Sequence, residues 1–147
     1  ANSTHLLRHP RFFKKGSAML RPTLILLALG LTFGFHPAFA QDSAAGEKVF
    51  VKCKACHQIG ENARNGVGPN LNGLIGRHSG SVEGYSYSDA NKNSGLTWDE
   101  ATFRDYIKNP RAKIPGTKMV FVGIQNDTEI DNLIAYLKEF SADGKRK

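Results

Sequence analysis

Residues 53–57 read Cys53-Lys54-Ala55-Cys56-His57, which is a C-x-x-C-H motif. Two thiols three positions apart on a helical turn can each form a thioether to one of the two vinyl groups of a haem. The histidine that follows then brings its imidazole to the iron. The motif therefore predicts one covalently bound haem c, attached through Cys53 and Cys56, with His57 as an axial iron ligand.

Other uses of a cysteine pair fit this chain less well. A dithiol redox centre is expected in a thioredoxin-like βαβ context, and no strand pattern precedes the motif. A zinc site needs four ligands, and beyond residue 40 the histidines are His57 and His78 alone. A disulfide between Cys53 and Cys56 would close a loop too small to stabilise the chain much. Haem attachment is the interpretation that remains.

Residues 1–40 are expected to be a cleaved secretory signal peptide. A basic stretch ends at Arg21, residues 23–35 are almost purely apolar, and Ala38-Phe39-Ala40 is a small-x-small cleavage site. Such an apolar run is too short for the helix of about 20 residues that spans a bilayer. The chain is then expected to mature to residues 41–147 outside the cytoplasm, in the periplasm, without stable membrane insertion. The alternative is an uncleaved leader that tethers the domain to the membrane.

The charge of the chain is concentrated in this leader. The whole sequence has 147 residues, 20 Lys and Arg, 13 Asp and Glu, and a formal net charge of +7. Five of the basic residues and none of the acidic residues lie before residue 41, so residues 41–147 carry a net charge of only +2. We therefore expect one small domain and no binding of nucleic acid.

The mature region is predicted to be all-α, with helices joined by long loops. A first helix begins near Asp42 and Ser43, and a glycine-rich stretch over residues 60–95 favours loops with one short helix at 88–93. Thr97-Trp98-Asp99-Glu100 resembles a capping box for a helix that ends at Asn109-Pro110. The last helix begins at Asn126 and shows apolar residues at helical spacing from Ile130 to Phe140. We expect the basic residues 145–147 to lie at its negative end.

The sixth iron ligand determines the predicted function. Met119 is the one methionine of the mature region, and it lies in a turn-rich loop 62 residues after His57. A thioether ligand raises the reduction potential of a haem relative to nitrogen ligands. Because two filled axial positions leave little room for a substrate, the pair His57 and Met119 favours electron transfer over catalysis. His78 is the alternative ligand.

Many further residues carry a resemblance to the class I cytochromes c, and in particular to small bacterial periplasmic relatives of mitochondrial cytochrome c. It extends over nearly the whole mature region, residues 41–147. The residues that carry it are Gly46, Phe50, the C-x-x-C-H motif, Gly68-Pro69-Asn70-Leu71, Gly76-Arg77, the stretch 85–93, Thr97-Trp98, Tyr106, Asn109-Pro110, the Pro115-Gly116-Thr117-Lys118-Met119 loop with Phe121, Leu133 and Tyr136.

This resemblance implies a fold and a set of roles. The fold is that of class I cytochromes c, with helices and long loops wrapped around one covalently attached haem. Gly46 allows the first and last helices to cross closely, and the Pro69 carbonyl accepts a hydrogen bond from His57. Phe121 closes its loop beside the haem edge, and the basic residues Lys52, Arg111 and Lys118 surround that edge. The remaining cofactor-binding residues are Arg77, Tyr87 and Trp98, which hold the haem propionates, and Asn91, Tyr106 and Thr117, which form the hydrogen-bond network behind the Met119 sulfur.

The expected function is that of a soluble, monomeric, periplasmic one-electron carrier rather than an enzyme. It would pass electrons from a membrane cytochrome bc complex to cytochrome c oxidase, another terminal oxidase or another periplasmic redox enzyme. The alternatives are a haem-based peroxidase or gas sensor, in which the Met119 bond is labile and opens a site, and a membrane-tethered redox module.

Overall fold

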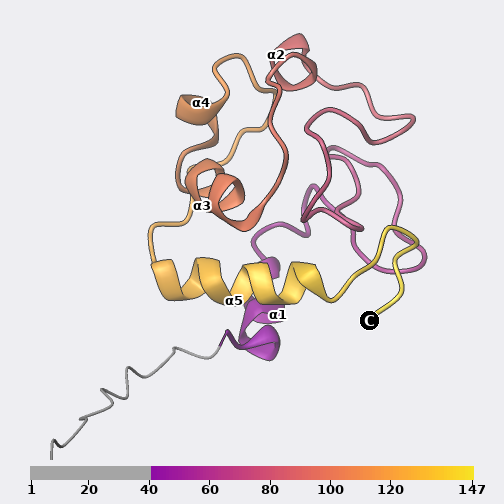
Figure 1. The fold of residues 1–147 in the computed structure, drawn as a ribbon, viewed down its shortest axis with the longest axis vertical. Helices are drawn as coiled ribbons and strands as arrows, with labels where there is room; N and C mark the ends of the chain where they lie inside the picture. The colour runs from indigo at the N-terminus through magenta and orange to yellow at the C-terminus, as the bar shows by residue number, and fades with distance from the viewer. Residues whose placement is uncertain (1–40) are drawn as a thin grey trace, which may run out of the picture. The chain divides into compact units, whose positions relative to one another are not determined.

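The computed structural model describes residues 41–147, so the predicted signal peptide over residues 1–40 lies outside the described residues. Within residues 41–147 there are helices and no strands, with isolated β-bridges at His78–Thr97 and Phe140–Arg146. The prediction of an all-α fold is confirmed. The helices are α1 (Ser43–Phe50), α2 (Asp89–Lys92), α3 (Glu100–Lys108), α4 (Pro110–Lys113) and α5 (Asp127–Lys138) (Figure 1).

The first and last helices begin where the sequence predicted, because a polar side chain caps each of them. The Asp42 carboxylate accepts a hydrogen bond of 3.1 Å from the Ala45 N–H at the start of α1. The Asn126 amide oxygen accepts one of 3.0 Å from the Glu129 N–H at the start of α5. Each cap satisfies a backbone donor that has no partner inside its helix.

The expected capping box at residues 97–100 is wrong in detail. The cap of α3 is Asp99, whose carboxylate accepts a hydrogen bond of 2.7 Å from the Thr102 N–H. Thr97 lies before the helix, and its hydroxyl pairs with the His78 ring instead. Asn109, expected only to end α3, also caps α4 by accepting from the Ala112 N–H.

Helix α1 packs across α5 at one close contact (Figure 1). The contact is at Gly46, where a Cβ atom would stand 1.9 Å from the Asn132 carbonyl oxygen and 2.8 Å from the Tyr136 Cβ. Only glycine leaves room for two helix backbones to approach this closely. The close crossing that Gly46 predicted is therefore confirmed.

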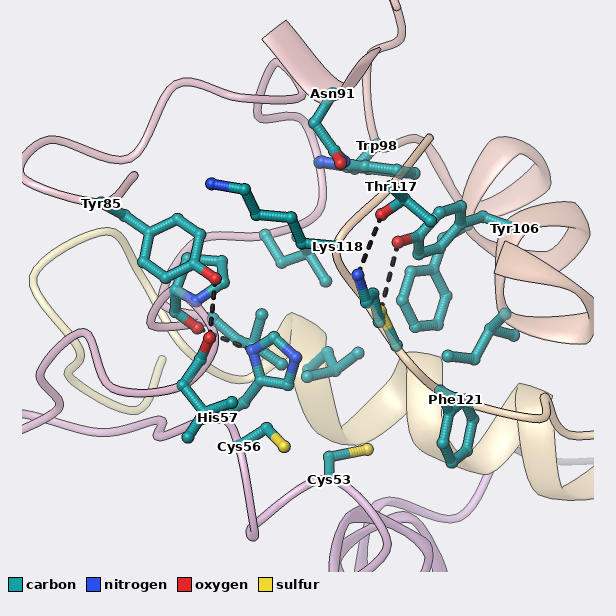
Figure 2. A pocket seen from close by; sticks show the side chains of 18 of the residues that line it. Cys53, Cys56, His57, Tyr85, Asn91, Trp98, Tyr106, Thr117, Lys118 and Phe121 are labelled. Atoms are coloured by element: carbon teal, nitrogen blue, oxygen red, sulfur yellow. Dashed lines mark hydrogen bonds between the residues drawn. The ribbon is translucent and has the colours of Figure 1, made fainter. Parts of the chain in front are cut away.

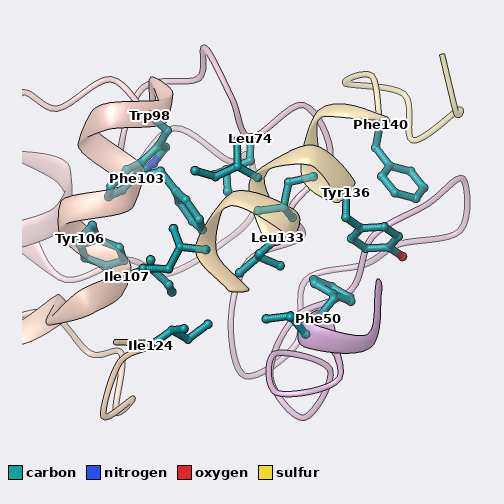
Figure 3. Packing of buried hydrophobic residues seen from close by; sticks show 14 of the residues in the cluster. Phe50, Leu74, Trp98, Phe103, Tyr106, Ile107, Ile124, Leu133, Tyr136 and Phe140 are labelled. Atoms are coloured by element: carbon teal, nitrogen blue, oxygen red, sulfur yellow. The ribbon is translucent and has the colours of Figure 1, made fainter. Parts of the chain in front are cut away.

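The apolar core spreads outward from this crossing (Figure 3). The Phe50 ring lies 5.3 Å from the Tyr136 ring, which in turn meets the edge of Phe140 at 5.2 Å. The apolar residues that α5 contributes are nearly inaccessible to solvent, as their helical spacing predicted: Ile130, Leu133, Ile134 and Leu137. Leu74, Trp98, Phe103, Tyr106, Ile107, Ile114 and Ile124 extend the core toward α3.

The C-terminal segment turns back after α5 and returns to the end of that helix. The helix ends at Lys138, and the chain turns back so that Phe140 bridges to Arg146. The Arg146 guanidinium then lies 3.2 Å from the Glu139 carboxylate and 5.4 Å from the centre of the Phe140 ring. Arg146 therefore lies beside the C-terminal end of α5, the location expected for the basic residues 145–147.

Residues 51–88 form the long loops that the glycine-rich composition predicted (Figure 1). Five glycines between residues 60 and 84 have positive φ, and Gly95 is a sixth beyond the short helix α2. Their backbone conformation is one that other residues rarely adopt. Among residues 41–147, no helix has the length and apolar character needed to cross a membrane.

Candidate haem-binding site

Side chains from α1, α2, α3, α5 and several loops line one cavity (Figure 2). Cys53, Cys56 and His57 line it from one segment, and Met119 lines it from a distant loop. Leu71, Leu74, Phe103, Ile107, Leu133 and Leu137 supply much of its apolar surface. All six of the other predicted cofactor-binding residues also line the same cavity: Arg77, Tyr87, Asn91, Trp98, Tyr106 and Thr117.

The cysteine motif forms a turn that follows directly from α1. The Cys53 N–H donates to the Phe50 carbonyl at 2.8 Å, and the Cys56 N–H donates to the Cys53 carbonyl at 3.0 Å. The His57 N–H donates to the same Cys53 carbonyl at 2.9 Å, an i to i−4 bond. Helical geometry therefore places both thiols and the imidazole at one wall of the cavity, as the spacing predicted. Burial raises the pKa of the Cys53 thiol to about 11.

The His57 ring is held in a single tautomer. Its Nδ1 lies 2.7 Å from the Pro69 carbonyl oxygen, the contact that the resemblance implied. Because a carbonyl only accepts, Nδ1 carries the hydrogen and Nε2 keeps a lone pair free for a metal. Burial lowers the pKa of His57 and so favours the neutral ring, against an opposing effect of the Pro69 bond.

A glycine also fixes the position of the same ring. A Cβ at Gly68 would stand 2.4 Å from the His57 Cε1 atom. Since real Cβ contacts are never this short, any other residue at position 68 would displace the imidazole. The Gly68-Pro69 pair thus supplies both the space for the ring and its hydrogen-bond acceptor.

Two hydrogen bonds position Met119, one to its sulfur and one from its backbone N–H. The Tyr106 hydroxyl donates to it at 3.2 Å, and the Met119 N–H donates to the Thr117 hydroxyl at 3.3 Å (Figure 2). Burial raises the pKa of Tyr106, while hydrogen bonding with Thr117 and Asn91 acts in the opposite direction. Tyr106 and Thr117 therefore contact Met119 directly, whereas Asn91 contacts Tyr106.

Arg77 carries a buried donor that has no partner within the protein. Its terminal nitrogens donate to the Asn72 carbonyl at 2.7 Å and to the Asn70 carbonyl at 3.1 Å. Its Nε is buried and lacks a hydrogen-bond partner. A buried unpaired donor is costly unless a ligand supplies the acceptor. A haem, which combines an apolar ring with carboxylate propionates, fits both this cationic donor and the apolar walls.

Tyr87 lies close enough to Arg77 to influence the pKa of its guanidinium. Burial lowers the pKa of Arg77, and the interaction with Tyr87 partly offsets that effect. Burial raises the pKa of Tyr87 in turn. Trp98 is buried and packs its ring 4.8 Å from the Tyr106 ring. The predicted propionate-binding residues Arg77, Tyr87 and Trp98 thus lie along one cavity.

The alternative ligand His78 does not line the cavity. Its ring is exposed, and Nδ1 lies 3.0 Å from the Thr97 hydroxyl. Of the three predicted basic residues, Lys52 and Lys118 line the cavity and Arg111 does not. Lys52 is also paired with Glu129 at 2.7 Å, so part of its charge is neutralised.

Several lining residues were not predicted as site residues. Tyr85 and Ser88 lie on the loop before α2, and Val67 and Val120 are exposed apolar residues of the cavity wall. The helical spacing predicted that Leu137 is buried. It did not predict that this side chain also lines the cavity. Irregular loops have no periodicity from which such a contact could be predicted.

An all-α fold that brings a C-x-x-C-H motif to a largely apolar cavity defines the class of covalent haem proteins. Comparison with known proteins identifies the family within this class. The sequence pattern of the family described as Cytochrome c matches residues 43–141. Cytochrome c2 from Blastochloris viridis is 61% identical over 111 residues, which cover 76% of this chain and 87% of the relative.

Two further similar proteins are also cytochromes c. Cytochrome c-550 from Nitrobacter winogradskyi is 65% identical over 106 residues, covering 72% of this chain and 97% of the relative. The solved structure of cytochrome cH from Methylobacterium extorquens is 52% identical, with a TM-score of 0.63, and the match covers 66% of this chain and 97% of that one. The chain therefore belongs to the cytochrome c family, as a bacterial class I member, and the family's electron-transport role and covalently bound haem c apply to it.

Proposed function

We propose that residues 41–147 form a soluble one-electron carrier whose haem c is attached through Cys53 and Cys56 and ligated by His57 and Met119. The observation that carries the proposal is that all four side chains line one cavity, although Met119 comes from a loop far along the chain. When bound, the haem supplies an iron that cycles between the ferric and ferrous states. Further support comes from the free Nε2 of His57, since its Nδ1 is occupied by the Pro69 carbonyl.

The surrounding residues would keep this site closed rather than catalytic. The Tyr106 hydroxyl and the Thr117 hydroxyl both contact Met119, which restrains its sulfur from leaving the cavity. The apolar side chains of Leu71, Leu74 and Leu133 exclude water from the walls. A restrained sixth ligand supports an electron carrier over a peroxidase or a gas sensor, because both alternatives need an open position.

We further propose that the mature protein begins at Gln41 and acts as a monomer in the periplasm. Its donors and acceptors would be a membrane cytochrome bc complex and cytochrome c oxidase, or other periplasmic redox enzymes, bound transiently. Supporting this, the basic residues Lys52 and Lys118 border the cavity. The N-terminal residue of the purified protein tests the first part: Gln41 supports the soluble carrier, and an intact leader supports the tethered module.

The ligand assignment is tested by a pair of substitutions. Met119→Ala removes the thioether, so the reduced protein is expected to bind carbon monoxide and to lose the weak absorption band of a methionine bound to ferric iron. His78→Ala is the matched control, since His78 lies outside the cavity. The proposal fails if Met119→Ala leaves the spectrum unchanged or if His78→Ala opens the site.

A further inference from the structure

Two loops on the same side of the cavity are joined by a reciprocal pair of side-chain hydrogen bonds. The Asn65 Nδ2 donates to the Glu83 carbonyl at 2.9 Å, and the Tyr85 hydroxyl donates to the Val67 carbonyl at 2.7 Å. Within residues 41–147, no backbone–backbone hydrogen bond joins segment 65–70 to loop 82–88. The two side chains therefore supply the hydrogen bonds that hold the loops together.

The first of these loops positions His57. The Asn65 amide oxygen accepts from the Asn70 N–H at 3.0 Å and so closes the turn over residues 65–70. Pro69 lies inside this turn, and its carbonyl accepts from His57 at 2.7 Å. The Gly68 N–H also donates to the Cys56 carbonyl at 2.8 Å. Segment 65–70 is thus fastened to the cysteine motif at one end and to loop 82–88 at the other.

The second loop extends to the Met119 side. The Ser86 carbonyl accepts a hydrogen bond of 3.1 Å from the Lys118 ammonium, and Lys118 directly precedes Met119. The Tyr85 and Tyr87 rings pack in an edge-to-face arrangement with their centroids 4.7 Å apart, and both residues line the cavity. Loop 82–88 therefore contacts the supports of His57 and of Met119.

From this continuity we propose that Asn65 and Tyr85 are positioning residues. Their two hydrogen bonds, here called the loop clasp, hold loop 82–88 so that Lys118 can restrain the Met119 segment. Loosening the clasp on the His57 side should then increase opening on the Met119 side. The link to iron ligation rests on the proposed function, but the link between the loops rests on the contacts alone.

The expected effect on loop opening is that of losing one hydrogen bond. Removing a donor of this kind should raise the population of the opened loop about threefold to tenfold. Tyr85→Phe deletes only the hydroxyl and keeps the ring that packs on Tyr87. Asn65→Asp keeps an acceptor for the Asn70 N–H and loses the donor to Glu83. Tyr85→Phe therefore removes one hydrogen bond of the loop clasp, and Asn65→Asp removes the other.

Hydrogen exchange of backbone amides in the haem-loaded protein provides the test. The Tyr87 N–H reports on loop 82–88, the Thr117 N–H reports on the Met119 segment, and the Ile130 N–H reports on α5. We expect both variants to speed exchange at Tyr87 and at Thr117 about threefold to tenfold, with no change at Ile130. The methionine-to-ferric-iron band should also be lost at a lower temperature.

Two substitutions serve as matched controls. Ser81→Ala deletes another hydroxyl that donates to a carbonyl, but the bond to His78 stays within one turn. Asn62→Asp introduces the same charge as Asn65→Asp at an exposed neighbouring position. Neither control should change exchange at Thr117.

The outcomes separate the two proposals. Faster exchange at Tyr87 but not at Thr117 would overturn the coupling, and equal acceleration at Ile130 would show general destabilisation instead. In a double-mutant cycle, Tyr85→Phe and Lys118→Leu should be non-additive at Thr117, because both act on one loop, and additivity would contradict the coupling. If exchange behaves as expected but the spectrum denies Met119 ligation, the loop clasp stands and the proposed function fails.

Discussion

The Tyr106 hydroxyl donates a hydrogen bond of 3.2 Å to the Met119 sulfur, although the two residues lie on different elements. Tyr106 projects from α3 and is buried, with its ring 4.8 Å from Trp98. Met119 follows α4 in an irregular loop. Helix α3 therefore fixes the position of a side chain that the loop alone would leave free to move.

The reduction potential should depend on this hydrogen bond. A donor directed at the sulfur withdraws electron density and weakens the thioether more as a ligand for ferric than for ferrous iron. Tyr106→Phe should therefore lower the potential by roughly 40 mV, the equivalent of about 1 kcal/mol for one electron. Tyr136→Phe, at a buried tyrosine outside the cavity, is the control for redox titration. An unchanged or raised potential in Tyr106→Phe would contradict this account.

The position of the His57 ring should be sensitive to one added methyl group. Gly68→Ala would place a Cβ 2.4 Å from the ring, so the imidazole must move and its bond to Pro69 must lengthen. We expect a partly high-spin spectrum or poor haem incorporation. Gly66→Ala adds the same methyl group two residues away, where the nearest atom is 3.8 Å distant. Equal effects of the two substitutions would disprove the steric argument.

An added methyl group should also disturb the crossing of α1 and α5. Gly46→Ala would place a Cβ 1.9 Å from the Asn132 carbonyl, which is backbone and cannot rotate away. Separating α1 from α5 should cost at least about 1–3 kcal/mol of the free energy of unfolding. Urea unfolding of the haem-loaded variant measures this cost. A variant as stable as the original protein would show that the helices do not depend on this contact.

Acid should destabilise the protein partly through Asp99. Hydrogen bonds from the Thr102 N–H and hydroxyl hold the pKa of Asp99 below its ordinary value of 3.8. Because the folded pKa is the lower one, the stabilisation is present above pH 3.8 and is lost as the pH falls through the folded pKa. The effect should be small because the carboxylate is fully exposed.

Asp99→Asn isolates this effect. The amide oxygen can still accept from the Thr102 N–H, but it does not titrate. We expect stability near the original at pH 7 and a shallower decline between pH 4 and pH 2. Unfolding by urea across that range measures both curves. Parallel curves would mean that the cap does not contribute to acid sensitivity.

The salt dependence of electron uptake should be shallow. Lys52 is paired with Glu129, whereas Lys118 and Arg111 have no ion-pair partner among residues 41–147. With few free charges near the cavity, reduction by a quinol–cytochrome c reductase should slow at higher ionic strength, but less than for a strongly basic carrier. Stopped-flow rates at several salt concentrations provide the measurement. A rate that is flat across ionic strength would contradict the expected electrostatic docking.

Features that depend on neighbouring residues were predictable from the sequence. The cap at Asn126 and the apolar spacing from Ile130 to Leu137 are local, and the structure confirms both. The C-x-x-C-H motif is equally local, because one helical turn sets its geometry. Contacts between distant loops were not predictable in the same way.

Asp99 and Arg77 show where prediction from the sequence ends. Thr97 and Asp99 are both good cap residues, and the choice between them depends on His78, which pairs with Thr97 from a distant turn. Arg77 was expected at the cavity, but the two carbonyls that orient its guanidinium belong to an aperiodic loop. Such contacts depend on the path of the folded chain rather than on spacing or composition.

In the proposed carrier, His57 and Met119 would both ligate the iron of one haem. The optical spectrum of the periplasmically matured protein, oxidised and then reduced, with carbon monoxide added, tests it most directly. We expect a low-spin c-type spectrum with the weak methionine-to-ferric-iron band and no change on addition of carbon monoxide. A high-spin spectrum, or one that carbon monoxide shifts, would contradict the claim and favour an open haem site.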